Sequence, residues 1–248
     1  MSHQLGRIKA IFMDMDDTLV MTGDADLKAY TDVVALAKQL HAQVNAPKLL
    51  EAWKQLFLKA PWDPTHKVPV NEWRSGLWKQ ALQSLGIEKP QMAEALQERF
   101  RASRLEHFAL DNGVKEMVAD LRQQGYKVLI ITNGHAEIQR GKLRQLHAVE
   151  HFDGIIVGGE EIKAGRAEKP ATSIFLKACE MAGCTPDEAI HIGDSLPADV
   201  QGAINAKLAA AILVNRWHKA LPRAGPYPTH IVEHVTELPR ILKALQAT

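Results

Sequence analysis

The sequence is poor in cysteine and has no excess of either charge, and both features exclude classes of protein. Its two cysteines, Cys179 and Cys184, are too few for a disulfide framework or for a zinc site closed by thiolates. They indicate a reduced, cytoplasmic protein. The 30 Lys and Arg residues balance 29 Asp and Glu residues, so we expect no nucleic-acid partner and no acidic membrane partner.

Long hydrophobic runs are also missing. No stretch reaches the roughly 20 apolar residues that a membrane span needs. The apolar run before Asp14 is too short for a signal peptide and ends in a carboxylate. Hydrophobic residues make up 46% of the chain and charged residues 24%, which is typical of a globular protein. We therefore expect a soluble globular chain.

What the sequence does contain is a series of short apolar runs that alternate with helical patterns. This alternation predicts an α/β fold, a doubly wound parallel sheet with a Rossmann-like core. The expected strands are Ile8–Met13, Lys127–Thr132, Gly154–Val157, Ala189–Gly193, Ala209–Val214 and a weaker His230–Val232. The expected helices between and after them are Gly113–Gln124, Ala136–His147, Ala171–Ala182, Pro197–Asn205 and Glu237–Leu245.

One long stretch interrupts the alternation directly after the first strand. It has no strand pattern and holds four helix-like segments, Asp26–Asn45, Pro47–Lys59, Asn71–Leu85 and Gln91–His107. Four of the five tryptophans fall within it and are expected to form a small core of their own. The pattern predicts a discontinuous core domain, 1–23 and 112–248, with an inserted α-helical cap domain over 24–111.

Polar side chains follow the ends of several predicted strands. Asp14, Asp16 and Asp17 follow the first strand, and Thr132 ends the second, with Asn133 and Gly134 directly after it. Lys169 precedes a helix, and Asp194 and Asp199 follow the Ala189–Gly193 strand. The carboxyl ends of parallel strands meet at one edge of a sheet, where ligands of open α/β folds bind. We therefore expect these side chains to form one site.

These motifs, in this order, resemble those of the haloacid dehalogenase superfamily, in the subclass with an inserted helical cap. Each motif alone is weak, but four in register at strand ends are specific. The resemblance covers essentially the whole chain. It implies a Mg²⁺-dependent phosphatase in which Asp14 is the nucleophile and forms an aspartyl phosphate.

The chemistry of the residues agrees with these roles. Asp14 and Asp16 are two apart, so extended backbone directs both to one face, where one can attack phosphorus while the other exchanges protons. Crowded carboxylates at Asp14, Asp16, Asp194 and Asp199 favour a hard cation such as Mg²⁺, with Asp199 a candidate for the outer sphere. Lys169 supplies positive charge.

Phosphate oxygens have further candidate donors, and several of these residues have ordinary structural alternatives. Thr132 offers a hydroxyl, and Asn133 and Gly134 offer backbone N–H groups at a helix start. Thr132 could instead cap that helix, Lys169 could be a surface lysine, and Asp199 could be a first-turn carboxylate. The histidines His135, His191 and His218 match no catalytic spacing and are expected in the core or on the surface.

Alternatives remain at the level of the reaction and the substrate. Asp16 disfavours a 2-haloacid dehalogenase, which typically lacks this second aspartate, whereas a phosphomutase and a non-catalytic binding protein stay open. Four segments resemble sugar-acid phosphatases of the subclass and favour a phosphorylated sugar or sugar acid, with a pyrimidine nucleotidase as the alternative. These segments are Ser103–His107, Ile131–Gly134, Val157–Glu160 and Glu168–Pro170.

Side chains of the insert are candidates for recognising such a substrate. Arg74 and Arg104 could bind a carboxylate through two donors each, with His107 as a further polar group. Trp73 and Trp78 could form apolar walls. The alternative is that the arginines are surface residues or are paired within the insert.

Overall fold

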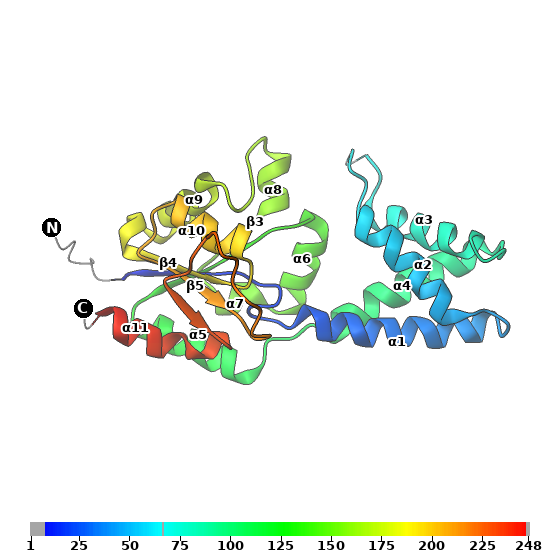
Figure 1. Cartoon of the computed structure of the whole chain (residues 1–248), viewed down its shortest axis with the longest axis horizontal. Helices are drawn as coiled ribbons and strands as arrows, with labels where there is room; N and C mark the ends of the chain where they lie inside the picture. Colours follow the sequence, from blue (N-terminus) through cyan, green and yellow to red (C-terminus); the bar gives the residue numbers. More distant parts are fainter. Residues whose placement is uncertain (1–7, 66, 247–248) are drawn as a thin grey trace. The chain divides into compact units, whose positions relative to one another are not determined.

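The computed structural model describes residues 8–65 and 67–246, which divide into two compact units (Figure 1). The sheet unit comprises residues 8–21 and 109–246, and the helical unit comprises Thr22–Phe108. Both boundaries lie nearer the N-terminus than we predicted. The reason is that helix α1 (Thr22–Leu40) starts early, and that Asp111 caps helix α5 (Asn112–Gln123) of the sheet unit by accepting from Val114 N.

The sheet unit is built on six parallel strands in the order β3-β2-β1-β4-β5-β6. The predicted doubly wound α/β fold is confirmed. Strands buried on both faces read as continuous apolar runs, which is why the sequence predicts them closely. Their bounds are β1 (Ala10–Met13), β2 (Lys127–Thr132), β3 (Gly154–Val157), β4 (Ala189–Gly193), β5 (Ala210–Val214) and β6 (His230–Val232).

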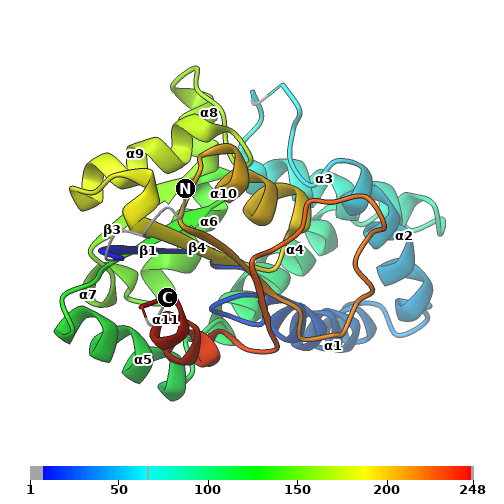
Figure 2. The ribbon, with the colours of Figure 1, turned by 60° about the vertical axis from the view of Figure 1, so that its left-hand side comes forward.

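Helices cover both faces of this sheet, with α9 (Thr172–Ala182) and α10 (Gln201–Asn205) on one side and α5 and α11 (Leu238–Gln246) on the other (Figure 2). Ile174 and Phe175 of α9 pack with Phe12 and Leu129 in a buried cluster, where each large apolar side chain contributes about 1.5–3 kcal/mol. The other helices of this unit are α6 (Ala136–Gln145), α7 (Ala148–His151) and α8 (Gly158–Lys163).

The structure departs from the predicted helices in two ways. The expected helix at Pro197–Asn205 is divided into a π-helical turn, Leu196–Val200, and the short helix α10. Such π turns are frequent at functional sites. Helices α7 and α8 were not predicted, because segments of four and six residues are too short to show helical periodicity.

Strand order determines where a ligand can bind in the sheet unit. The chain runs outward from β1 through β2 to β3, and then returns to place β4 on the other side of β1. The strand order reverses at β1, and crevices at the carboxyl ends of strands beside such a reversal are the usual ligand sites of open α/β sheets.

The helical unit has its own core. Trp53 and Trp78 stack with ring centroids 4.5 Å apart and planes 9° apart, and Phe100 meets Trp53 edge-on. These two tryptophans therefore form the core expected of the insert. Besides α1, the helices of this unit are α2 (Ala46–Lys59), α3 (Val70–Gln83) and α4 (Pro90–Glu106). Over residues 8–65 and 67–246, no helix combines the length and apolarity needed to cross a bilayer.

Candidate active site

The first strand delivers Asp14 into a buried position at its carboxyl end. The Asp14 N–H donates to Ile192 O of β4 at 2.9 Å, so the sheet fixes the backbone there. The carboxylate accepts a hydrogen bond from Lys169 Nζ at 2.6 Å. Burial raises the pKa of Asp14 to about 8, although Lys169 acts to lower it. Asp14 is thus a desolvated carboxyl that needs positive charge in addition to that of Lys169 to ionise at neutral pH.

Lys169 is a buried lysine shared by two carboxylates, and not a surface residue. Its side chain is 1% exposed, and Nζ lies 2.6 Å from both Asp14 Oδ1 and Asp199 Oδ1. Burial alone would lower the pKa of Lys169, but the two neighbouring carboxylates raise it above the usual lysine value. The ammonium therefore stays charged and can face a phosphoryl oxygen.

Asp199 lies in the π-helical turn, and both of its oxygens accept hydrogen bonds. Oδ1 accepts from Lys169 and from His191 Nε2 at 2.8 Å, and Oδ2 accepts from Ser195 N at 3.0 Å. Burial acts to raise the pKa of Asp199, but Lys169 and His191 hold it well below its usual range. Gly193 permits this packing, because a Cβ there would lie 2.2 Å from Asp199 Cγ. These contacts favour a supporting role for Asp199 beside Lys169.

His191 takes part in this network, which the sequence did not indicate. The side chain is buried in β4, as expected for a core histidine, and its ring meets Phe175 edge-on. Burial lowers the pKa of His191 below 6.5. The neutral ring must carry its proton on Nε2, because an ionised Asp199 can only accept. The one sequence signal was a polar residue within an otherwise apolar strand.

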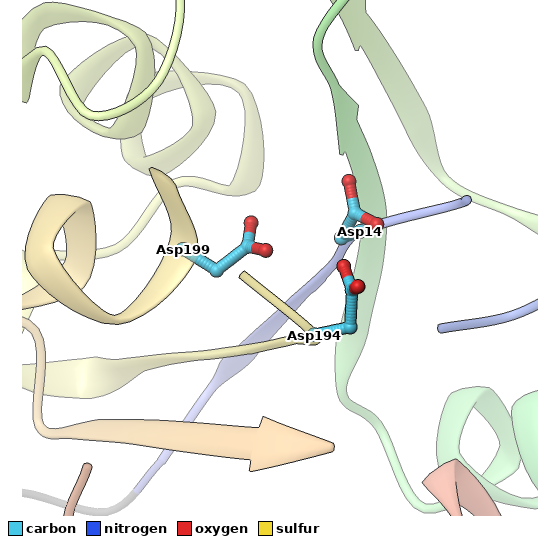
Figure 3. A group of neighbouring side chains, drawn as sticks. All are labelled: Asp14, Asp194 and Asp199. Atoms are coloured by element: carbon cyan, nitrogen blue, oxygen red, sulfur yellow. The ribbon is translucent and has the colours of Figure 1, made fainter. Parts of the chain in front are cut away.

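Three carboxylates come close enough to hold a metal ion together. Asp14, Asp194 and Asp199 each offer an oxygen, and these oxygens lie within 4.8 Å of one another (Figure 3). Partial burial and the charges of Asp199 and Asp17 raise the pKa of Asp194 to about 6. Three carboxylates against the single ammonium of Lys169 leave an excess of negative charge, which a divalent cation with oxygen ligands would neutralise.

Asp16 is held in a different way from the other carboxylates, which corrects its expected grouping with them. Its Oδ2 accepts from Gln139 Nε2 at 2.7 Å, and its Oδ1 forms an ion pair with Lys142 Nζ; both partners come from α6. The Asp16 carboxylate is thus not in the three-carboxylate group. Its role as acid and base stays a prediction.

Thr132 is buried at the end of β2 and belongs to the same network. Its Oγ1 accepts from Gln139 Nε2 at 2.7 Å. Thr132 does not cap α6, since the residue in the cap position is His135. The alternative role as a helix cap is therefore excluded.

Asn133 and Gly134 form the loop after β2, where three hydrogen bonds fix the chain. The Asn133 amide donates to Lys169 O at 2.8 Å and accepts from Lys169 N at 3.0 Å, which braces the segment that carries the buried lysine. The Gly134 N–H donates to Glu168 Oε2 at 3.2 Å. This bond corrects the expectation for Gly134, because its N–H is directed to a carboxylate of the chain.

The candidate residues of the helical unit are mostly engaged within it. Trp78 is fully buried in the core of the unit, so the expectation that it forms a ligand wall is wrong. Trp73 Nε1 and Arg74 Nε donate to the carbonyls of Ala60 and Pro61, each at 2.9 Å. The two remaining candidates also have partners inside the unit: Arg104 pairs with Asp26, and His107 Nδ1 contacts Ser103 O.

Sequence reasoning missed Gln139, Lys142, His191 and Glu168, which contact the expected residues directly. Gln139 and Lys142 lie three apart on α6 and therefore share a face of the helix. That spacing was the one signal available, and it does not distinguish a site from an ordinary helix surface.

The chain is similar in sequence to a known family of hydrolases. A family model described as haloacid dehalogenase-like hydrolase matches residues 8–207. The chain is 31% identical over 244 residues to N-acylneuraminate-9-phosphatase of Rattus norvegicus, covering 97% of this chain and 96% of the rat protein.

Solved structures show the same fold. The HAD-hydrolase YfnB of Bacillus subtilis, solved bound to magnesium, has a TM-score of 0.68 at 24% identity. The match covers 96% of this chain and 99% of YfnB. A 2-haloacid dehalogenase of Pseudomonas syringae has a TM-score of 0.66 at 26% identity, with the same two coverages.

Proposed function

The chain belongs to the haloacid dehalogenase-like hydrolases, and we propose that it hydrolyses phosphomonoesters with Asp14 as nucleophile. The observation that carries the proposal is the contact of the buried Asp14 with Lys169, beside Asp194 and Asp199. It joins a nucleophilic carboxylate, a fixed positive charge and a set of oxygen ligands. Similarity over nearly the whole chain to a curated phosphatase supports the same reaction.

The first half of the reaction uses Asp14 and Asp16. A carboxylate oxygen of Asp14 attacks phosphorus, and the bond between phosphorus and the leaving oxygen breaks. Asp16, protonated at this stage, gives its proton to the leaving oxygen, so that an alcohol departs and an aspartyl phosphate remains. Lys169 and the Thr132 hydroxyl stabilise the negative charge on the phosphoryl oxygens.

The second half returns both residues to their starting states. Asp16, now ionised, accepts a proton from water as the water oxygen bonds to phosphorus. The bond from phosphorus to Asp14 breaks, and inorganic phosphate and the free carboxylate are released. One residue acts first as acid and then as base, so the cycle leaves no net proton on the protein.

Mg²⁺ is the cofactor that we propose for this site. Asp14 and Asp194 would hold it, with Asp199 beside them, and these oxygen donors and the excess negative charge fit a hard divalent cation. The ion would supply positive charge that favours the ionised form of Asp14 and neutralises the phosphate.

We propose a phosphorylated sugar or sugar acid as the substrate, on the basis of the similarity to N-acylneuraminate-9-phosphatase. Release of inorganic phosphate from N-acetylneuraminate 9-phosphate, hexose phosphates and pyrimidine monophosphates, each with Mg²⁺, tests this. We expect the highest kcat/KM for the sugar acid and no turnover by Asp14→Asn, which serves as the blank. A clear preference for the nucleotides would reassign the substrate, and activity in Asp14→Asn would refute the mechanism.

Dehalogenation is the second candidate, because a 2-haloacid dehalogenase shares the fold at 26% identity. The presence of Asp16 argues against it, since displacement of halide requires no proton donor for the leaving group. Chloride release from 2-chloropropionate in the presence of EDTA, without phosphatase activity in Mg²⁺, would favour the dehalogenase.

A further inference from the structure

Gln139 lies between two residues to which the proposed reaction gives different tasks. Its side chain projects from α6 and is 3% exposed. Nε2 lies 2.7 Å from Asp16 Oδ2 and 2.7 Å from Thr132 Oγ1. A single amide nitrogen thus links the proposed acid and base to the proposed phosphate-binding hydroxyl.

The chemistry of these partners fixes the orientation of the amide. An ionised Asp16 can only accept, so the NH₂ group of Gln139, and not its oxygen, must face the carboxylate. The second amide hydrogen then goes to Thr132 Oγ1, which accepts it. The hydroxyl must donate its own proton elsewhere, and in this structure it reaches Asn133 O at a long 3.4 Å. A phosphoryl oxygen is a better acceptor and can replace that contact.

We propose that Gln139 is a positioning residue that holds Asp16 in place for proton transfer and directs the Thr132 hydroxyl toward the phosphoryl group. The inference rests on the proposed phosphatase reaction. Gln139 differs from Lys142, the other α6 partner of Asp16, because it orients the carboxylate without adding charge. Its N–H can donate to Asp16 both before and after the proton moves, and it binds the ionised carboxylate more strongly.

Two aryl phosphates of nearly equal size separate this role from a merely structural one. Phenyl phosphate has a basic leaving oxygen that needs a proton, whereas the nitro group makes 4-nitrophenolate a good leaving group without one. Gln139→Met keeps the length and volume of the side chain but removes both N–H donors. Gln145→Met, on an exposed position of the same helix, is the matched control.

We expect kcat/KM of Gln139→Met with phenyl phosphate, which reports the steps up to departure of the leaving group, to fall roughly 10- to 100-fold, because a misplaced catalytic group costs about that much. With 4-nitrophenyl phosphate we expect kcat/KM to fall less than about threefold, since its departure depends little on the acid. The later attack of water, in which Asp16 is the base, should slow equally for both esters, because both form the same aspartyl phosphate. Gln145→Met should match the wild type.

An equal fall in kcat/KM for both esters would overturn the inference, and so would unchanged kinetics. If Gln139→Met fails to fold, Gln139→Glu keeps the shape while replacing Nε2 by an acceptor, and the same difference between the two esters is expected. Wild-type protein that hydrolyses neither these esters nor the sugar and nucleotide phosphates named above would refute the proposed function instead, so the two failures can be told apart.

Discussion

At the scale of single residues, His191 shows how a buried side chain can support the site without touching a substrate. Its Nε2 donates to Asp199, which in turn accepts from Lys169, and Lys169 contacts Asp14. The hydrogen-bonded groups thus follow one another in the order imidazole, carboxylate, ammonium and carboxylate. Removing the first donor leaves a buried carboxylate with one partner fewer.

We expect His191→Phe to lower the free energy of unfolding by about 1.5–3 kcal/mol, the usual contribution of a hydrogen bond to a charged group. Phenylalanine fills the space beside Phe175 but cannot donate. Urea denaturation in Mg²⁺ measures the change, with His151→Phe as control, because His151 is partly exposed in helix α7. Equal stability of the wild type and His191→Phe would show that the contact to Asp199 contributes nothing.

At the scale of elements, the loop after β2 and the start of α8 approach each other so closely that only glycine fits. A Cβ on Gly159 would lie 2.3 Å from Gly134 O and 2.6 Å from Ala136 N, both of them backbone atoms. The same loop carries Asn133, which braces Lys169. Displacing the loop should therefore disturb the buried lysine.

Gly159→Ala should destabilise the protein by about 1–3 kcal/mol, the cost of overpacking, and should reduce phosphatase activity as well. Gly141→Ala is the matched control, since a Cβ there meets nothing within 4 Å and the residue lies inside α6. It should stabilise by about 0.5–1 kcal/mol through the helix propensity of alanine. Thermal unfolding of both variants measures these changes in stability. An unchanged Tm for Gly159→Ala would contradict the close approach.

The strands could be predicted from the sequence, and so could the polar residues at their carboxyl ends. Both depend on short continuous stretches of the chain. The buried strands are mainly apolar runs, and Asp14 and Asp194 directly follow two of them. The contacts of Gln139 could not be predicted, because its partner Asp16 is 123 positions away. The π-helical turn was missed for another reason, since its composition is that of an ordinary first helical turn.

At the scale of the whole molecule, binding of Mg²⁺ should couple stability to pH. The pKa values of Asp194 and Asp14, about 6 and about 8, lie above the ordinary 3.8. Both carboxyls therefore bind protons more tightly in the folded, metal-free protein than in the unfolded chain. Metal-free protein should lose stability as pH rises through 6 and toward 8. A bound cation needs the ionised carboxylates, so protons compete with it at low pH.

We therefore expect the rise in Tm on adding Mg²⁺, relative to EDTA, to be small at pH 5.5 and to grow up to pH 8. Taking the difference at each pH removes contributions from groups that do not contact the ion. Asp194→Asn should reduce the rise at every pH. A Tm difference independent of pH in the wild type would mean that Asp14 and Asp194 do not exchange protons for the cation.

The tryptophans give the two units different optical properties. Trp53 and Trp78 are stacked in the core of the helical unit, whereas Trp217, in the sheet unit, is 68% exposed. In Trp217→Phe all remaining indole emission would arise from the helical unit, since the other four tryptophans belong to it. Intrinsic fluorescence would then follow the folding of that unit alone, while far-ultraviolet circular dichroism follows both.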